Sequence, residues 1–262
     1  MRLEHANWFH LLLMIMICAI IVATIFTARR RKLNIRRIPG LSAIDETVGR
    51  ATEMGRPMLF SVGLDPIGPT TLQAIAVMTY VARLAARYGN RLIVPVSDPI
   101  MLAVAEEATR EAWLSEGKPE AHRPDDVRFL SDQQFAFAAG MMGLVMREQV
   151  ASTFLFGYFY AESLLLAEAG LESGAIQVAG TPATTQVPFF IVSCDYTIIG
   201  DEYYAASAYL TQEPTLLGSL VGQDISKAIL ILMIILGTIL SIFQGESGNF
   251  LIKLLSPHTG GG

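Results

Sequence analysis

Uninterrupted apolar runs alternate with stretches of helical periodicity through most of the chain. The first run, PMLFSV at 57–62, leads through a Gly/Pro turn into a helical pattern over 70–88. Further apolar runs of strand length follow at 91–96, 127–130, 152–158 and 174–179. Because polar and apolar positions do not alternate within these runs, we expect both faces of each strand to be covered.

A helical pattern follows or precedes each of these strands. The remaining expected helices are 42–54, 99–116, 132–149, 160–170 and 201–212, with a helical stretch continuing to about 222. Short links between strands and helices favour parallel strands joined by right-handed crossovers. The sequence therefore predicts an α/β fold with a doubly wound, mainly parallel sheet of flavodoxin or Rossmann type. Residues 188–194, PFFIVSC, are expected to form a sixth strand or a buried extended segment.

Two longer apolar stretches flank this region. Residues 8–27 carry no formal charge over the length that crosses a bilayer core as a helix. Six cations between residues 29 and 37 follow this stretch, which favours a retained transmembrane helix over a cleaved signal peptide and places the basic side in the cytoplasm. The second stretch, 228–243, begins beside Lys227 and has no polar face, so we prefer a membrane span to a buried core helix.

We therefore expect a multi-pass protein of the plasma membrane whose α/β domain is cytoplasmic and flanked by two transmembrane helices. The expected order is an external N-terminus 1–7, a transmembrane helix 8–27, a basic juxtamembrane segment 28–37, the cytoplasmic α/β domain 38–224, a transmembrane helix 225–244 and an external tail 245–262. In the first span, Ala19, Ala23 and Thr27 form a face of small residues that either packs on another helix or arises by chance.

The charge distribution restricts the choice of partner. Residues 38–224 hold 22 acidic and 10 basic side chains, a balance of −12, which argues against a nucleic-acid partner. The six cations near residue 30 suit a membrane surface with anionic lipid. Cys18 and Cys194 lie far apart without metal-binding spacing, so we expect neither a disulfide nor a structural zinc site. No cation near Cys194 in sequence would activate its thiol.

Polar side chains follow the carboxyl ends of the predicted strands, which is where ligands bind in sheets of this kind. The candidate ligand-binding residues are Asp65, Thr70, Asp98, Asp132 and Glu162. Carboxylate oxygens also bind Mg²⁺, so this ion is the one cofactor that the pattern suggests. The alternative, which we prefer, is that Asp98 and Asp132, each preceded by a serine, cap the helices that follow them.

The loop after the first strand partly resembles a phosphate-binding loop. Gly63, Gly68 and Thr70 match the pattern GxxxxGK[ST], but Pro69 stands in place of the lysine. Asp65 adds a negative charge to this loop, and proline removes an amide that would bind phosphate. We therefore favour a structural turn in which a threonine caps the following helix.

The segment 36–64, RRIPGLSAIDETVGRATEMGRPMLFSVGL, resembles a family of prokaryotic membrane proteins known only as a domain of unknown function. Members of that family pair an N-terminal span with the signature IPGLSAIDE and VGRATEMGRP. The resemblance implies the same membrane-anchored architecture, and it brings no catalytic residues to this chain.

Two functional hypotheses follow from these patterns. The first is a structural or interaction subunit that self-assembles in the membrane as a homo-oligomer, with the aromatic-rich later half as a contact surface. The second is a sensor or enzyme that binds a ligand or divalent cation at the strand ends. The sequence shows no known catalytic motif, which inclines us against an enzyme. A transport subunit ranks last, because neither expected span holds a central ionisable residue.

Overall fold

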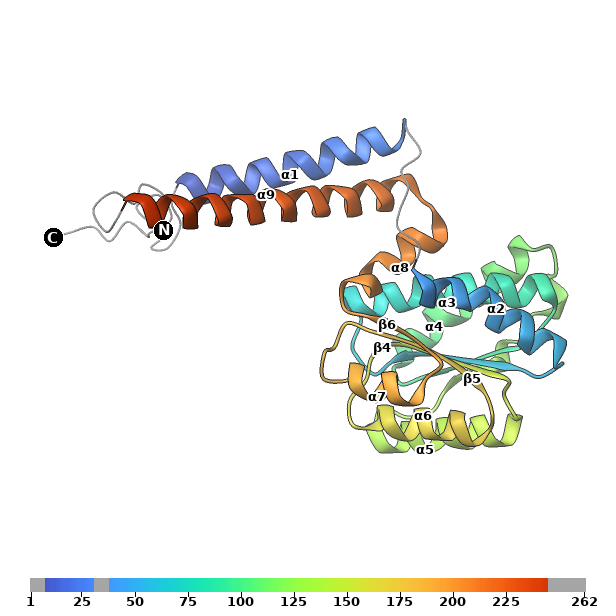
Figure 1. Ribbon diagram of the computed structural model, residues 1–262. Helices are drawn as coiled ribbons and strands as arrows, with labels where there is room; N and C mark the ends of the chain where they lie inside the picture. Colours follow the sequence, from blue (N-terminus) through green and yellow to red (C-terminus); the bar gives the residue numbers. More distant parts are fainter. Residues whose placement is uncertain (1–7, 31–37, 245–262) are drawn as a thin grey trace. The chain divides into compact units, whose positions relative to one another are not determined.

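The computed structural model describes residues 8–30 and 38–244 (Figure 1). The chain divides into two compact units: one is Arg36–Thr211, and the other combines Met1–Ile35 with Gln212–Gly262. The expected external segments 1–7 and 245–262, and most of the basic juxtamembrane segment, lie outside the described residues.

The larger unit is built around a parallel sheet. Its strands are β1 (Met58–Gly63), β2 (Leu92–Val96), β3 (Val127–Phe129), β4 (Ser152–Tyr158), β5 (Ile176–Thr181) and β6 (Tyr196–Ile199). The order across the sheet is β3-β2-β1-β4-β5-β6, and each neighbouring pair is parallel. The strand order reverses between β1 and β4. The structure thus confirms the predicted α/β class with a mainly parallel sheet.

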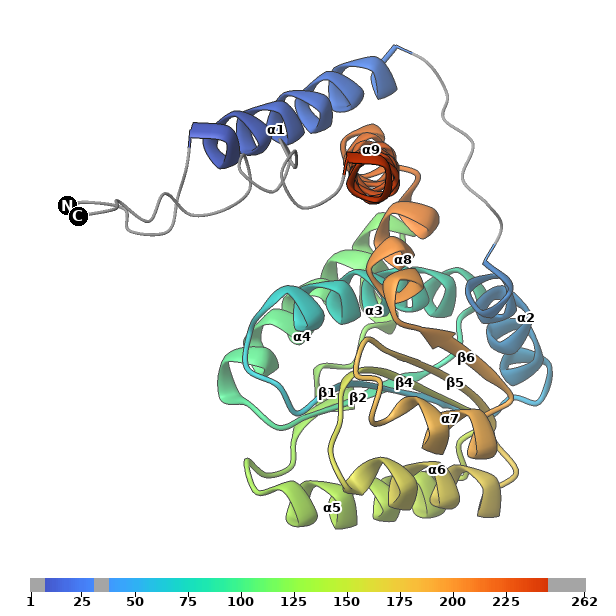
Figure 2. The ribbon, with the colours of Figure 1, turned by 60° about the vertical axis from the view of Figure 1, so that its left-hand side comes forward.

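Helices cover both faces of this sheet, as Figures 1 and 2 show. One face is covered by α2 (Pro39–Glu53), α3 (Pro69–Tyr88), α4 (Pro99–Ser115) and α8 (Asp201–Thr211). The other is covered by α5 (Gln134–Glu148), α6 (Glu162–Glu172) and α7 (Val187–Ser193). Two short 3₁₀ turns, Pro119–Ala121 and Pro124–Asp126, lead into β3. Every residue of β1 is buried, which is what a double cover produces.

Aromatic side chains fill much of the core. The Phe60 ring stacks on Phe154 and Phe156, with ring centroids 6.0 and 5.6 Å apart, and Phe156 in turn stacks on Tyr203. On the opposite face, Phe159 meets Phe190 edge-on at 5.6 Å. All of these rings are buried, so most of the phenylalanines in the later half of the chain serve to pack the core.

The expectation that residues 188–194 form a strand was wrong. Residues 188–193 lie within the short helix α7, Cys194 is its C-cap residue, and the sixth strand follows at Tyr196–Ile199. In α7 only Phe190 is buried, whereas Val192 is 87% exposed, so the apolar run does not mark a covered strand. Because β6 is an edge strand with one buried residue, Ile198, its sequence carries a weak signal.

The helix of the signature segment begins three residues earlier than predicted. Pro39 occupies the first turn and Ile38 is the N-cap residue. The Ser42 hydroxyl therefore lies inside the helix, where it donates to the Ile38 carbonyl (3.3 Å) and lies 3.1 Å from the Tyr209 hydroxyl. Ser42, the first residue of the expected helix, therefore does not cap it, and no side chain does. One face of α2 packs against the rest of the larger unit, and its residues Leu41, Ile44 and Val48 are fully buried there.

The smaller unit, within the described residues, is a pair of antiparallel helices, α1 (Trp8–Ala28) and α9 (Pro214–Gln244). Their backbones approach closely at two glycines: an added Cβ would lie 2.6 Å from Ile25 Cα at Gly218 and 2.9 Å from Ile21 Cα at Gly222. The face of Ala19, Ala23 and Thr27 is exposed and does not make this contact. The expected boundary at residue 224 falls inside α9, which continues through it without a break.

By length and composition alone, both helices are long and apolar enough to cross a membrane. The qualifying stretches are His10–Ala28 and Pro214–Ile239. The second stretch begins eleven residues before the expected span 225–244 and therefore includes polar residues.

Candidate functional site

The carboxyl ends of β1 and β4 meet where the strand order reverses. Past the end of β1, the Leu64 N–H donates to the Tyr158 carbonyl (3.0 Å). Gly63 has φ +84°, and an added Cβ there would lie 2.5 Å from the Tyr158 carbonyl oxygen. The two strand ends are therefore held together by backbone, and the side chains that follow them form the candidate site.

Glu162 is the most buried of the predicted site residues, and it is fully enclosed. Its Oε1 accepts from the Tyr160 backbone N–H (2.8 Å), and its Oε2 accepts from the Gln134 side-chain amide (2.5 Å). The carboxylate thus ties the turn after β4 to the first residue of α5. Both of its oxygens have partners within the protein, which makes Glu162 a positioning group for Tyr160.

Asp65 and Tyr160 come together across the strand reversal. The Tyr160 hydroxyl lies 3.4 Å from Asp65 Oδ1, and the Tyr158 ring packs edge-on against Tyr160 at 5.1 Å. Burial and the neighbouring Asp65 carboxylate raise the pKa of Tyr160. This pair forms the polar edge of the site, since Asp65 is half-buried and Tyr160 exposed.

Thr70 lies in the first turn of α3 and contacts α8. Its carbonyl accepts from the buried Tyr203 hydroxyl (2.7 Å), and its own hydroxyl lies 3.4 Å from that of Tyr204. The hydroxyl of Thr71 donates to the Pro66 carbonyl (2.8 Å), which closes the preceding loop. The N-cap residue is Gly68 and no side chain caps it, so the expectation of a threonine cap was wrong.

The structure assigns Asp98 to a local role. Its Oδ1 accepts from the Ile100 N–H (2.7 Å) at the start of α4, which confirms the predicted cap. The second predicted cap is not found at α5, where Gln133 is the N-cap residue and makes no side-chain cap. Asp132 is exposed and accepts weakly from the Gln133 side-chain amide (3.4 Å).

The predicted carboxylates follow neighbouring strands in the order Asp132, Asp98, Asp65 and Glu162. Strands lie about 4.8 Å apart, so the outer members of this row are on the order of 14 Å apart at the strand ends. Across residues 8–30 and 38–244, no three His, Cys, Asp or Glu side chains gather closely enough to hold a metal ion. The structure therefore brings Asp65 and Glu162 to one place and leaves Asp98 and Asp132 along the edge.

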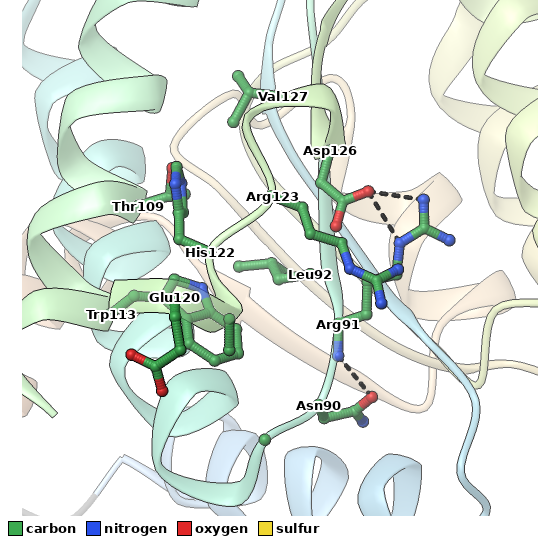
Figure 3. Close-up of a pocket in the computed structure, with 12 residues that line it drawn as sticks. Asn90, Arg91, Leu92, Thr109, Trp113, Glu120, His122, Arg123, Asp126 and Val127 are labelled. Carbon is green, nitrogen blue, oxygen red and sulfur yellow. Dashed lines mark hydrogen bonds and ion pairs between the residues drawn. The ribbon is translucent and has the colours of Figure 1, made fainter. Parts of the chain in front are cut away.

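A cavity that sequence reasoning missed lies at the opposite edge, beside the amino ends of β2 and β3 (Figure 3). It has a volume of about 240 Å³. The polar and aromatic side chains that line it are Asn90, Arg91, Thr109, Trp113, Glu120, His122, Arg123 and Asp126. The His122 Nε2 lies 3.2 Å from the Thr109 hydroxyl, and burial lowers the pKa of His122.

The charges beside this cavity are largely paired with one another. The guanidinium of Arg91 binds Asp126 (Nη2 to Oδ1, 2.6 Å) and Glu148 (Nη1 to Oε2, 2.7 Å), and Arg128 also contacts Glu148 at 3.4 Å. The hydrogen bond that Arg91 donates to Asp126 raises the pKa of Arg91, and the one that it donates to Glu148 lowers the pKa of Glu148. We interpret this network as a clamp between β2, β3 and α5, and we rank the strand-end site above the cavity as a candidate for ligands.

The cysteines are both free thiols. Cys194 follows α7, and burial raises its pKa to about 12, so its thiol is protonated at neutral pH. This agrees with the expectation of an unreactive group.

The fold and this site define an α/β protein with a doubly covered parallel sheet and polar groups at the strand reversal. The chain belongs to the family described as Domain of unknown function (DUF6754), whose model matches residues 2–252. The match spans both units. It confirms the prediction that the chain belongs to a family without an assigned activity. Comparison with curated proteins and comparison with solved structures each gave no match.

Proposed function

We propose that this protein is a membrane-anchored structural or interaction subunit that assembles with further copies of itself. The observation that carries the anchoring is the exposure of large apolar side chains around the α1–α9 pair. Among them are Leu12, Ile15, Val22 and Phe26 on α1, and Ile231, Leu232, Ile234 and Ile235 on α9, all at least half exposed. So much apolar surface is unfavourable in water and suits lipid hydrocarbon.

The order of charges along the chain supports an orientation. Arg29 and Arg30 follow α1 directly and belong to the group of six cations that precedes the α/β unit. Cationic loops are retained on the cytoplasmic side, so the α/β unit is cytoplasmic in this proposal and the membrane is the plasma membrane. Because α1 and α9 are antiparallel, the end of α1 and the start of α9 lie on that same side, and α9 then leads the chain away from it. The family, in this reading, is one of prokaryotic membrane proteins marked by the signature at 38–57.

An exposed apolar surface on α6 and α7 supports self-assembly. Leu171 is 67% exposed on α6, and Ile191 and Val192 are 55% and 87% exposed on α7. Clusters of this kind on a folded domain mark interaction surfaces. Copies tethered in one membrane plane meet at high effective concentration, so a modest surface suffices for assembly.

Extraction and sizing test this proposal. The full chain is expected to stay in the membrane pellet after alkaline carbonate treatment, and to run as an oligomer by light scattering in native-lipid nanodiscs. Val192→Asp on α7 is expected to reduce the assembled fraction, whereas Leu114→Asp, a matched exposed leucine on α4, leaves it unchanged. A wild-type chain that is released by carbonate, or that is monomeric in nanodiscs, contradicts the proposal.

A second candidate is a sensor or enzyme that binds a ligand or divalent cation at the strand ends. The specific observation in its favour is the strand order, which is that of Rossmann-type sheets and places the crevice between β1 and β4. Asp65 and Tyr160 lie at that place. Under this proposal Mg²⁺ or a nucleotide raises the melting temperature of the full chain, and Asp65→Asn reduces the shift. If Mg²⁺, nucleotides and nucleosides all leave the melting temperature unchanged, this candidate is rejected.

A further inference from the structure

An acidic and a basic residue lie on α9 at a depth that its sequence alone does not reveal. Gly222 packs against Ile21 and Gly218 against Ile25, which fixes the antiparallel register of α1 and α9. Lys227 lies five residues beyond Gly222, or about 8 Å further along the helix. It is therefore level with a point near Met16, close to the middle of the 21-residue helix α1.

This register brings charge into the apolar layer. Between Trp8 and Ala28, α1 contains no Asp, Glu, Lys or Arg. When α1 spans the bilayer core, Asp224 and Lys227 lie within that core, and Lys227 lies near its centre. A displacement of the bilayer toward the end of α9 would expel the exposed Val22 and Phe26 into water, which is unfavourable. With the bilayer at this level, α9 holds a central ionisable residue, which the expected span 225–244 does not.

The two charged residues face away from α1. The residues of α9 buried against α1 include Gly218, Gly222 and Ser226. Asp224 follows Gly222 by two residues, which is about 200° around the helix, and both Asp224 and Lys227 are exposed. An ionisable face in hydrocarbon is costly, and such residues normally face other protein or a water-filled cavity.

We propose that a second copy of this chain covers this face of α9. Copies inserted in one membrane share their orientation, so two α9 helices pack in parallel about a twofold axis along the membrane normal. In that arrangement Asp224 of each copy is level with Asp224 of the other and one turn from its Lys227, so the two aspartates and two lysines form one cluster without net charge. The inference rests on the proposed function and deepens it by naming the contact through which the membrane helices assemble.

Cysteine cross-linking in native membranes tests the contact. Ile231 lies one turn beyond Lys227 on the same face and is 57% exposed. In a full chain with Cys18→Ala and Cys194→Ser, Ile231→Cys is expected to form a disulfide-linked dimer on oxidation with copper phenanthroline. The matched control is Leu12→Cys, which is 64% exposed on α1 at a similar depth and is expected to remain monomeric.

A charge exchange between differently tagged copies tests the pairing. In the Ile231→Cys background, Asp224→Lys gives a copy with two cations, and Lys227→Asp gives a copy with two anions. Each variant alone is expected to cross-link at least tenfold less than the parent, and co-expression is expected to restore cross-links between unlike tags. Since each variant has lost any pairing within its own helix, this recovery arises only between copies.

Several results would overturn the inference. One is that Ile231→Cys cross-links no better than Leu12→Cys. Another is that the two charge variants fail to recover on co-expression although both are present in the membrane fraction. Rapid labelling of Ile231→Cys by a membrane-impermeant maleimide would assign the face to a water-filled path instead. If the wild-type chain is an oligomer and any of these results is found, only the α9 contact is rejected. If the wild-type chain is a monomer, the proposed function is rejected as well.

Discussion

The carbonyl oxygen of Val62 lies where a side chain on Gly157 would begin. An added Cβ on Gly157 would come 2.1 Å from that oxygen, and the φ of Gly157 is +137°, which L side chains rarely adopt. Gly63 makes the reciprocal approach to Tyr158 on β4. The strand reversal, and with it the position of Asp65 and Tyr160, therefore depends on two residues that lack side chains.

Gly157→Ala is expected to destabilise the α/β unit by about 3 kcal/mol or more, because it adds both a backbone clash and a strained φ. Gly55→Ala is the control: its φ is +64°, but no atom lies within 4 Å of the added Cβ. That variant is expected to lose about 1 kcal/mol, from backbone strain alone. Denaturant unfolding of the detergent-solubilised chain measures both losses, and equal values would show that the contact with Val62 is unimportant.

Asp126→Asn is expected to cost about 1–3 kcal/mol of unfolding free energy, because it weakens a largely buried ion pair and leaves Arg91 less well compensated. The Asp126 side chain is 9% exposed, and it contacts both Arg91 and Arg128. The exposed pair of Arg50 and Glu46 on α2 provides the comparison, and Glu46→Gln is expected to cost less than about 0.5 kcal/mol. Similar losses for the two variants would contradict the clamp that we assign to Arg91.

His122 is expected to make stability depend on pH. Burial lowers its pKa in the folded state below the ordinary value of 6.5, so the unfolded chain binds its proton first as the pH falls. The stability contributed by neutral His122 is therefore present above about pH 6.5 and is lost as the pH falls toward the folded pKa. His122→Gln is expected to flatten the slope of the melting temperature between pH 7 and pH 5.

The indole of Trp113 lines the same cavity and provides an optical signal for this titration. In a Trp8→Phe background, the fluorescence of Trp113 is expected to change as His122 is protonated, and to become insensitive to pH in the His122→Gln variant. A pH profile that survives the substitution would assign the effect to another group.

Gly222→Ile is expected to separate α1 from α9, because an added Cβ would lie 2.9 Å from Ile21 Cα and 2.5 Å from the Thr24 hydroxyl. Ala228→Ile places the same side chain at an exposed position of α9. Thermal aggregation in detergent is expected to begin at a lower temperature for Gly222→Ile and to be unchanged for Ala228→Ile. If both variants behave as the wild type, the close approach does not stabilise the pair.

Local features of the fold were readable from the sequence, and long-range ones were not. β4 was predicted at its observed bounds, since a fully buried strand is a continuous apolar run. Asp98 was predicted as a cap, because its partner is two residues away. The contact of Arg91 with Asp126 spans 35 residues, and no local pattern links the two. The level of Lys227 along α1 depends on the register of the two helices, which appears only when both are seen together.

The close packing at Gly218 and Gly222 has a consequence for the whole polypeptide. It holds the segment before the α/β unit against the segment after it. The intervening chain is therefore a long loop whose two ends are held together non-covalently. While the helix pair stays together, an opened α/β unit has both of its ends held close, which lowers the entropy of the opened chain and favours its refolding. A single proteolytic cut inside this loop would consequently leave two fragments, one ending in α1 and one in α9, that remain associated through the helix pair.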